Sequence, residues 1–233
     1  MTYPGKAAQE VWTGRVEDAF LELPVISSEQ RYEGHVWTIR TDTVDVGGHV
    51  VSRDVVVHTG AVAVLALNDS DNVYLLRQYR HPAGMALFEP PAGLLDVDGE
   101  PPLETAKREF AEEAGLVADS WHVLADFFNS PGGSTEILRI YLAQEVTPRP
   151  GGRVHTGEAE EVDMPGAWIS LEEAVGLVLE GRLANPTAVV GILAAAAAKN
   201  RGWSSLRPAD APWPVRDYLV ATGRVRTGGR IDR

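Results

Sequence analysis

Runs of alternating or continuous apolar residues predict strands over much of the first half of the chain. Four such runs occupy residues 35–46, 50–57, 61–67 and 73–80. The first two are separated by Gly47 and Gly48, a pair that suits a tight hairpin turn. The third, AVAVLAL, is apolar throughout, as expected of a strand buried on both faces. The polar turn NDSDN then reverses the chain into the fourth run.

Segments with apolar residues three and four positions apart predict helices in the second half of the chain. These segments are residues 103–114, 171–181 and 187–199. A weaker pattern, VEDAFLEL at 16–23, predicts a short helix near the N-terminus. Two further strands are expected at 121–128 and 137–146. This order predicts a mixed β-sheet with helices packed on its faces, an α/β or α+β fold.

Three segments carry neither pattern. Residues 82–91 contain three prolines and a glycine and predict a loop. Residues 149–166, rich in glycine, proline and glutamate, predict a long mobile loop. The tail from about Leu206 onward is predicted to be irregular.

Composition narrows the class of protein. With 233 residues, of which 44% are apolar and 23% charged, the chain can bury a substantial single core. No apolar run approaches the roughly 20 residues that span a bilayer, and no signal peptide is evident, so no membrane contact is expected. The absence of cysteine excludes disulfides and fits a cytoplasmic protein. A net charge of −12 argues against a nucleic-acid surface.

The helix predicted at 103–114 carries a concentration of carboxylates. Glu109, Glu112 and Glu113 lie at i, i+3 and i+4, so they share one face beside an apolar stripe. Like charges at this spacing destabilise a helix unless something compensates them, and Arg108 offsets only part of the charge. Magnesium would be a natural compensation, because it prefers hard oxygen ligands. The alternative is a charged, solvated helix face.

A longer pattern surrounds these carboxylates. Its positions are Gly93, Glu100, Arg108, Glu109, Glu112, Glu113, Gly115 and Leu116. The arrangement resembles the Nudix box, the metal-binding signature of the Nudix hydrolases, which cleave nucleoside diphosphates linked to another moiety. Six residues separate Gly93 from Glu100, one more than the family spacing, which implies a loop one residue longer.

The resemblance implies a fold and a division of the chain. The fold is a Nudix-type α/β/α sandwich with a mixed β-sheet, preceded by a β-rich N-terminal segment. The implied parts are an N-terminal segment at 1–57 that serves dimerisation, a Nudix hydrolase domain at 58–205 and a C-terminal tail at 206–233. It also implies a homodimer, in which the N-terminal strands reach across to the partner's substrate site.

The resemblance also implies a metal site. Glu109, Glu112 and Glu113 would be catalytic metal ligands, and the carbonyl of Ala92 would supply another ligand. The expected ion is Mg²⁺, with Mn²⁺ or another divalent cation as the alternative. Arg108 would form a structural ion pair with Glu100.

A proline narrows the substrate class. Pro131 lies sixteen residues after Gly115, and a proline at that offset resembles the mark of the ADP-ribose pyrophosphatases. The implied reaction is metal-dependent hydrolysis of ADP-ribose to AMP and ribose 5-phosphate. Two alternatives stay open: hydrolysis of another nucleoside diphosphate derivative such as a nucleotide sugar, and a sensor that binds ADP-ribose without cleaving it.

Further residues are candidates for substrate binding, each with a structural alternative. Arg77 and Arg80 fall near the end of a predicted strand and would bind the diphosphate or the terminal ribose, or form rim ion pairs. Glu89 would bind a ribose hydroxyl or stabilise a turn, and Arg53 would bind substrate or be structural. In the dimer, Tyr32 and Trp37 are candidates to stack on adenine; the alternative is core packing.

The base that activates water is expected outside the box. Related enzymes take it from a mobile loop, which here contains Glu158, Glu160 and Glu161. Glu160 and Glu161 lie closest to the family's catalytic position, and the sequence does not separate them. The alternative is an acidic, solvated loop.

Overall fold

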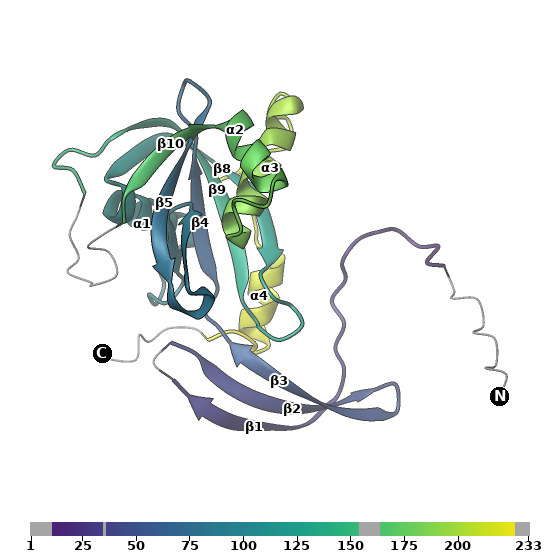
Figure 1. Ribbon diagram of the computed structural model, residues 1–233. Helices are drawn as coiled ribbons and strands as arrows, with labels where there is room; N and C mark the ends of the chain where they lie inside the picture. The colour runs from purple at the N-terminus through teal and green to yellow at the C-terminus, as the bar shows by residue number, and fades with distance from the viewer. Residues whose placement is uncertain (1–10, 35, 154–163, 227–233) are drawn as a thin grey trace, which may run out of the picture.

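A three-stranded N-terminal sheet lies below an α/β/α body in the computed structural model, which describes residues 11–34, 36–153 and 164–226 (Figure 1). The N-terminal sheet is built from β1 (Val25–Glu33), β2 (Thr38–Val46) and β3 (His49–Val57), all antiparallel. The hairpin predicted at Gly47 and Gly48 is confirmed, and both residues have positive φ angles.

Two further sheets form the body. The larger has the order β11-β8-β9-β4-β7, with β4 (Ala61–Ala66), β7 (Ala92–Leu94), β8 (Leu116–Phe128), β9 (Ile137–Pro148) and β11 (Arg207–Pro208). The smaller has the order β10-β5-β6, with β5 (Asn72–Arg80), β6 (Met85–Glu89) and β10 (Gly166–Ser170). Because β4 runs parallel to β9 and antiparallel to β7, the larger sheet is mixed, as predicted.

The helices cover both faces of this body. They are α1 (Pro102–Glu109), α2 (Leu171–Leu179), α3 (Pro186–Asn200) and α4 (Pro214–Ala221), with a π-helical turn, η2 (Phe110–Ala114), continuing α1. A short 3-10 turn, η1 (His81–Ala83), joins β5 to β6. The three helices predicted in the second half of the chain are confirmed, and the box helix ends in a widened turn closed by Gly115 in the left-handed region.

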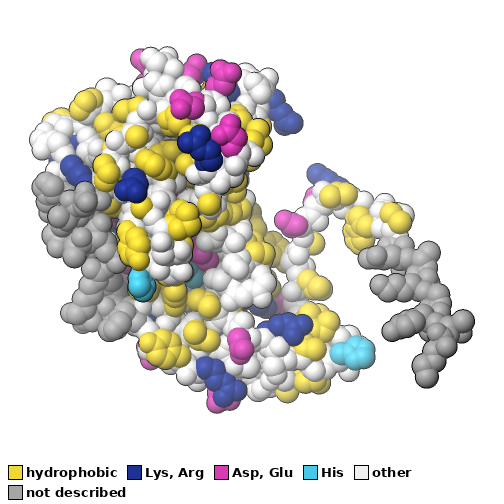
Figure 2. All heavy atoms as spheres, viewed as in Figure 1, with side chains coloured by type: hydrophobic (Ala, Val, Ile, Leu, Met, Phe, Trp, Pro, Cys, Tyr) yellow, Lys and Arg dark blue, Asp and Glu magenta, His cyan; other side chains and the backbone are white. Residues whose placement is uncertain are grey.

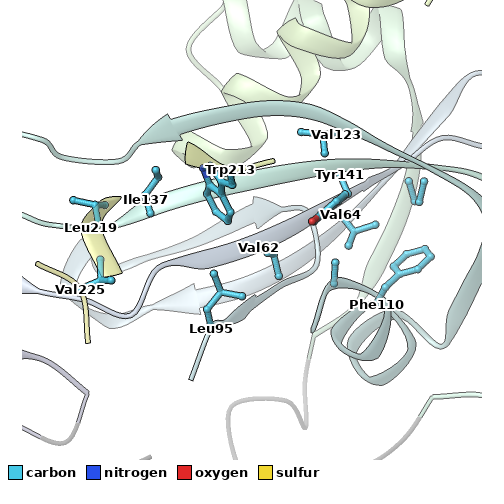
Figure 3. Close-up of a cluster of buried hydrophobic side chains, with 13 residues drawn as sticks. Val62, Val64, Leu95, Phe110, Val123, Ile137, Tyr141, Trp213, Leu219 and Val225 are labelled. Atoms are coloured by element: carbon cyan, nitrogen blue, oxygen red, sulfur yellow. The ribbon is translucent and has the colours of Figure 1, made fainter. Parts of the chain in front are cut away.

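Strand β4 shows why the body needs two helical layers. All six of its residues are buried, which confirms the prediction for the AVAVLAL run. Val62 and Val64 pack in one cluster with Phe110 of η2, as Figure 3 shows. The residues between them, such as Ala63, pack in a second cluster with Ile192 of α3. The period-2 alternation of a strand sends successive side chains into different cores.

The helix predicted at 16–23 is wrong. This segment has no regular structure and runs along the outside, with Val16 93% and Leu21 74% exposed. An isolated eight-residue helix is marginal in water, and among the described residues nothing buries Val16, Phe20 or Leu21, which stay exposed. Only Phe20 finds an aromatic partner, Tyr218 of α4, at a ring-centroid distance of 4.5 Å. The strand β1 that follows was not predicted in full.

Two expected irregular segments are ordered, so these predictions are wrong. The loop predicted at 82–91 contains β6, which pairs with β5 and overrides the local proline signals. The tail after Leu206 contains β11 and α4, and its Trp213, Leu219 and Val225 complete a core cluster (Figure 3). Tertiary burial fixes these short elements, which are too short to show a period. Most of the loop predicted at 149–166 lies outside the described residues.

A buried arginine attaches the C-terminal segment to the sheet. Arg139 of β9 is 2% exposed, and its Nε and Nη2 donate to both carboxylate oxygens of Asp126 at 2.8 and 3.0 Å. It also donates to the carbonyls of Ala211 and Pro212 and lies 4.5 Å from the ring centroid of Trp213. One guanidinium therefore links β8, β9 and the segment leading to α4.

No helix in the described ranges is long and apolar enough to cross a membrane. The longest, α3, has 15 residues.

His58 is buried where the N-terminal sheet joins the body. Its Nδ1 accepts a hydrogen bond from the Gly60 N–H at 3.0 Å, and its Nε2 lies 3.7 Å from a Glu136 oxygen. Burial lowers the pKa of His58 below its ordinary value of 6.5, and Glu136 only partly opposes this effect. The folded state therefore favours the neutral form of the His58 imidazole.

His58 should make folding sensitive to mild acid. Because the unfolded chain binds this proton more readily, stability is complete above about pH 6.5 and falls as pH drops below that value. We expect the free energy of unfolding to fall less between about pH 7.5 and about pH 5 in His58→Asn than in wild type. Urea unfolding at several pH values measures this, with exposed His49→Asn as control. Equal pH dependence in wild type and His58→Asn would contradict the expectation.

Candidate active site

The side chain of Glu109 lies against the backbone of Gly93. A Cβ atom on Gly93 would come within 2.1 Å of the Glu109 Cγ and 2.4 Å of its Oε1. Real Cβ atoms do not approach other atoms so closely, so only glycine allows this contact. Gly93 sits in β7 opposite Val62 of the buried strand β4, which gives it little freedom to move away.

Glu113 reaches the same short strand. Its Oε2 accepts a hydrogen bond from the backbone N–H of Ala92 at 2.9 Å. The helix that carries Glu109 and Glu113 is packed against β4 through Phe110. Two carboxylates of the predicted helix face are therefore brought together at Ala92–Gly93.

Arg108 is shared among three carboxylates. It donates two hydrogen bonds to Glu100, both of 3.0 Å, which confirms the predicted ion pair. Its Nη1 also donates to Glu109 at 2.8 Å and to Glu112 at 3.1 Å. A single cation therefore faces Glu100, Glu109 and Glu112, and negative charge is in excess around it.

The pKa values reflect this arrangement. Burial raises the pKa of Glu109 to about 7, against the attraction of Arg108, and the charges of Glu112 and Asp96 raise it further. Glu100 is the opposite case, since the hydrogen bonds from Arg108 lower its pKa. A positive ion placed beside Glu109 would favour its charged form.

The carboxylates of Glu109, Glu112 and Glu113 are suitable ligands for a hard divalent cation, although they do not surround one point. Across the described residues, no three acidic or histidine side chains are grouped as a metal cluster. Glu109 and Glu112 are instead held by Arg108, and Glu113 by the N–H of Ala92. Carboxylate oxygens on one helix face, one of them on the partly buried Glu109, are the hard donors that Mg²⁺ or Mn²⁺ prefers.

A second polar cluster lies at the end of β5. The carboxylate of Glu89 is buried and accepts hydrogen bonds from both Nε and Nη2 of Arg80 and, at 2.7 Å, from Asn185. Burial raises the pKa of Glu89, while Arg80 and Asn185 oppose that shift. Arg77 is exposed, and the unbroken register of β5 places it on the opposite face from Arg80.

Arg53 and Pro131 line a cavity of about 470 Å³ between the N-terminal sheet and the body, here called the junction cavity. Its walls come from three segments: β2 and β3, the 128–135 region, and the C-terminal segment through Leu219 and Arg224. The structure thus brings two predicted substrate-binding residues together.

Tyr32 and Trp37 are not core residues in the single chain. They are 60% and 48% exposed, and among the described residues the ring neighbour of Trp37 is His58, at 6.3 Å. Glu158, Glu160 and Glu161, the candidates for the base, lie outside the described residues.

Three residues of these clusters had no functional signal in the sequence. Asn185 precedes Pro186 and has the form of a helix cap, a role that it also fills by accepting from the Ala188 N–H. Phe128 ends a strand. Arg224 lies in the tail that was predicted to be irregular. Only the fold brings them to these positions.

Comparison with known proteins is consistent with this geometry. The family model described as NUDIX domain matches residues 57–189. An ADP-ribose pyrophosphatase of Mycobacterium tuberculosis is 43% identical over 204 residues, 87% of this chain and 97% of that protein. One of Bacillus subtilis is 36% identical over 68% of this chain and 84% of that protein.

Other similar proteins are named for different substrates. A GDP-mannose pyrophosphatase of Yersinia enterocolitica is 33% identical over 67% of this chain and 83% of its own length. A crystal structure titled as that of an ADP compounds hydrolase matches with a TM-score of 0.64 and 19% identity, covering 90% of this chain and all of that chain. At that identity the structural match supports the fold alone.

Proposed function

Since this chain belongs to the NUDIX domain family, we propose that it hydrolyses the diphosphate bond of ADP-ribose to AMP and ribose 5-phosphate with a divalent metal. The observation that carries the proposal is the convergence of Glu109 and Glu113 on Ala92–Gly93, beside Arg108 and Glu112. The relatives named ADP-ribose pyrophosphatase supply the substrate. A cytoplasmic location belongs to the same proposal.

Glu109, Glu112 and Glu113, with the carbonyl of Ala92, are the residues that would hold the metal, proposed as Mg²⁺ with Mn²⁺ as the alternative. When bound, such an ion neutralises the diphosphate, activates a water and stabilises the leaving oxygen. Arg108, fixed by Glu100, orients Glu109 and Glu112 by its hydrogen bonds to them. Gly93 leaves the space in which Glu109 lies.

The substrate would extend away from these carboxylates. Glu89, held by Arg80, is the candidate for a ribose hydroxyl, and Arg77 is the candidate on the other face of β5 for the diphosphate. Arg53 and Pro131 would contact the substrate in the junction cavity. Glu160 and Glu161 are proposed as the source of the base that takes a proton from the attacking water.

The substrate panel tests this function. We expect purified protein with Mg²⁺ to convert ADP-ribose to AMP and ribose 5-phosphate, seen by chromatography, and to lose activity with a chelator. GDP-mannose is included because a relative is named a GDP-mannose pyrophosphatase. Faster turnover of GDP-mannose would assign the protein to nucleotide sugars. Tight ADP-ribose binding without cleavage would make it a sensor, which the complete carboxylate set disfavours.

Gly93→Ala should remove most of the activity without unfolding the chain. The added methyl would occupy the position of the Glu109 side chain, which must then move by more than 1 Å. Displacement of this size at a catalytic group costs about 10²-fold in turnover. Gly176→Ala in α2 is the matched control, because its Cβ would meet nothing within 4 Å. Wild-type kcat in Gly93→Ala would show that the position of Glu109 is unimportant.

A homodimer is also part of the proposal. All nine residues of β1 are exposed in the single chain, and so are apolar side chains of the adjoining strands. Figure 2 shows hydrophobic side chains on this lower sheet and along the extended N-terminal arm. A second copy would cover them and bring Tyr32 and Trp37 to a substrate site.

We expect light scattering to give twice the chain mass of 25.2 kDa. Tyr32→Ala and Trp37→Ala should raise KM for ADP-ribose more than they change kcat, because stacking contributes to binding. A monomer with full activity would exclude the exchange of N-terminal strands.

A further inference from the structure

Asn185 joins helix α3 to the buried carboxylate of Glu89. Its Oδ1 accepts a hydrogen bond from the N–H of Ala188 at 3.0 Å and caps the first turn of α3. Its Nδ2 donates to the Oε2 of Glu89 at 2.7 Å. These two partners fix the orientation of the amide, because a backbone N–H can only donate and an ionised carboxylate can only accept. Both polar atoms of the Asn185 side chain therefore have partners in the folded chain.

The helix cap alone does not require asparagine at this position. Aspartate and serine cap helices about as well as asparagine, because the cap needs only an oxygen that accepts from the first turn. The cap of α2 is an example, since the Ser170 hydroxyl accepts from the Glu173 N–H at 3.2 Å. What distinguishes asparagine from these residues is its amide nitrogen, and here that nitrogen binds Glu89. The contact with Glu89 is therefore separable from the cap.

Glu89 in turn fixes one edge of the Arg80 guanidinium. Its two oxygens accept from Nε and Nη2 of Arg80, a bidentate pair that sets the plane and direction of the guanidinium. Glu89 is 4% exposed, whereas the side chain of Arg80 is 44% exposed. The third nitrogen of Arg80, Nη1, has no hydrogen-bond partner among the described residues. Two N–H donors therefore remain on a half-exposed guanidinium whose orientation is set from inside the fold.

This cluster lies close to the proposed metal site. Glu89 precedes Ala92 by three residues, so their Cα atoms are at most about 11 Å apart. Between them, the carbonyl of Pro91 accepts from the N–H of the buried Val64 at 2.8 Å, which holds the connection against β4. A nucleoside diphosphate derivative bound through its diphosphate at the metal site is long enough to reach the pair of Arg80 and Glu89.

We propose that Asn185 is a positioning residue of the substrate site and acts through Glu89 on Arg80. Its hydrogen bond favours the charged form of the buried carboxylate and holds that carboxylate in the geometry that pairs with Arg80. The free N–H groups of Arg80 then bind acceptor oxygens of the nucleoside diphosphate substrate, for which a guanidinium is well suited. The inference rests on the proposed function and adds to it a residue that does not itself contact the substrate.

Two substitutions keep the cap and remove the donor. Asn185→Ser retains a cap oxygen, and Asn185→Asp also places a second carboxylate beside Glu89. We expect KM for ADP-ribose to rise about tenfold in Asn185→Ser, the effect of losing a hydrogen bond to a charged group, and further in Asn185→Asp. Because binding is affected, kcat should stay within about threefold of wild type. Calorimetric titration with ADP-ribose and a chelator, which prevents hydrolysis, should give the same order of affinities.

A matched control and a double-mutant cycle separate positioning from a general effect on the fold. Ser170→Ala removes the cap of α2, so it should lower Tm and leave KM unchanged. In an Arg80→Gln background, Asn185→Ser should raise KM little further, because its effect acts through Arg80. A purely structural role for Asn185 would instead multiply the two effects.

The proposal is overturned if both Asn185 variants keep the wild-type KM, or if the effects of Arg80→Gln and Asn185→Ser on KM multiply. Failure of both Asn185 variants to fold would also overturn it, since Asn185 would then be structural. A wild type that does not hydrolyse ADP-ribose would overturn the proposed function itself. Hydrolysis with an unchanged KM in the Asn185 variants would overturn only the positioning role.

Discussion

Replacing both Glu160 and Glu161 by glutamine is expected to lower kcat for ADP-ribose by about 10²- to 10⁴-fold, the range for loss of a general base. The carboxylates of the box helix already have other partners. Glu109 is confined by Gly93 and Arg108, and Glu113 accepts from the Ala92 N–H. Glu89 is held by Arg80 and Asn185.

The described residue Arg153 contacts the end of the box helix. Its Nε donates to the carbonyl of Glu112 at 3.3 Å. Arg153, the last described residue before Glu160 and Glu161 in the sequence, therefore lies beside the proposed site. The two single variants decide which glutamate is the base.

Measurement of kcat at saturating ADP-ribose tests the assignment. Glu158→Gln is the matched control, since it removes the same charge from the same segment and should keep near wild-type turnover. Magnesium binding should change little in all four proteins, because the box is untouched. If the double variant turns over near the wild-type rate, a box glutamate must act as the base.

Asp126→Asn is expected to destabilise the fold by about 3–5 kcal/mol, the range for removing the partner of a buried charge. It would leave the charge of Arg139, which is 2% exposed, without its carboxylate partner. The loss should affect the C-terminal segment first, because the same guanidinium binds Ala211 and Pro212. Urea unfolding followed by circular dichroism measures the change.

Asp71→Asn is the control for the chemistry of the substitution. Its ion pair with Lys199 is exposed, so about 1 kcal/mol or less should be lost. Combining Asp126→Asn with Arg139→Met should restore part of the stability by removing the buried charge. A loss in Asp126→Asn no larger than that in Asp71→Asn would show that Arg139 is not held by this pair.

The sequence by itself determined the elements whose signals are local. The apolar run of β4 required burial on both faces, and the glutamates of the box helix had to share a face because of helical spacing. The resemblance to the Nudix box added the Arg108–Glu100 pair, which the hydrogen bonds confirm. In each case residues within one element, or a few residues apart, carry the information.

Tertiary structure alone decided the contacts between distant segments. Glu89 and Asn185 lie 96 positions apart, and Arg139 binds carbonyls more than 70 positions away. The junction cavity combines three segments, one of them in a tail that was predicted to be irregular. Periodicity reports which face of an element is apolar, but it does not report which other element will cover that face. Packing of the whole chain makes that choice, and it set α4, the neighbours of Glu109 and the position of Arg224.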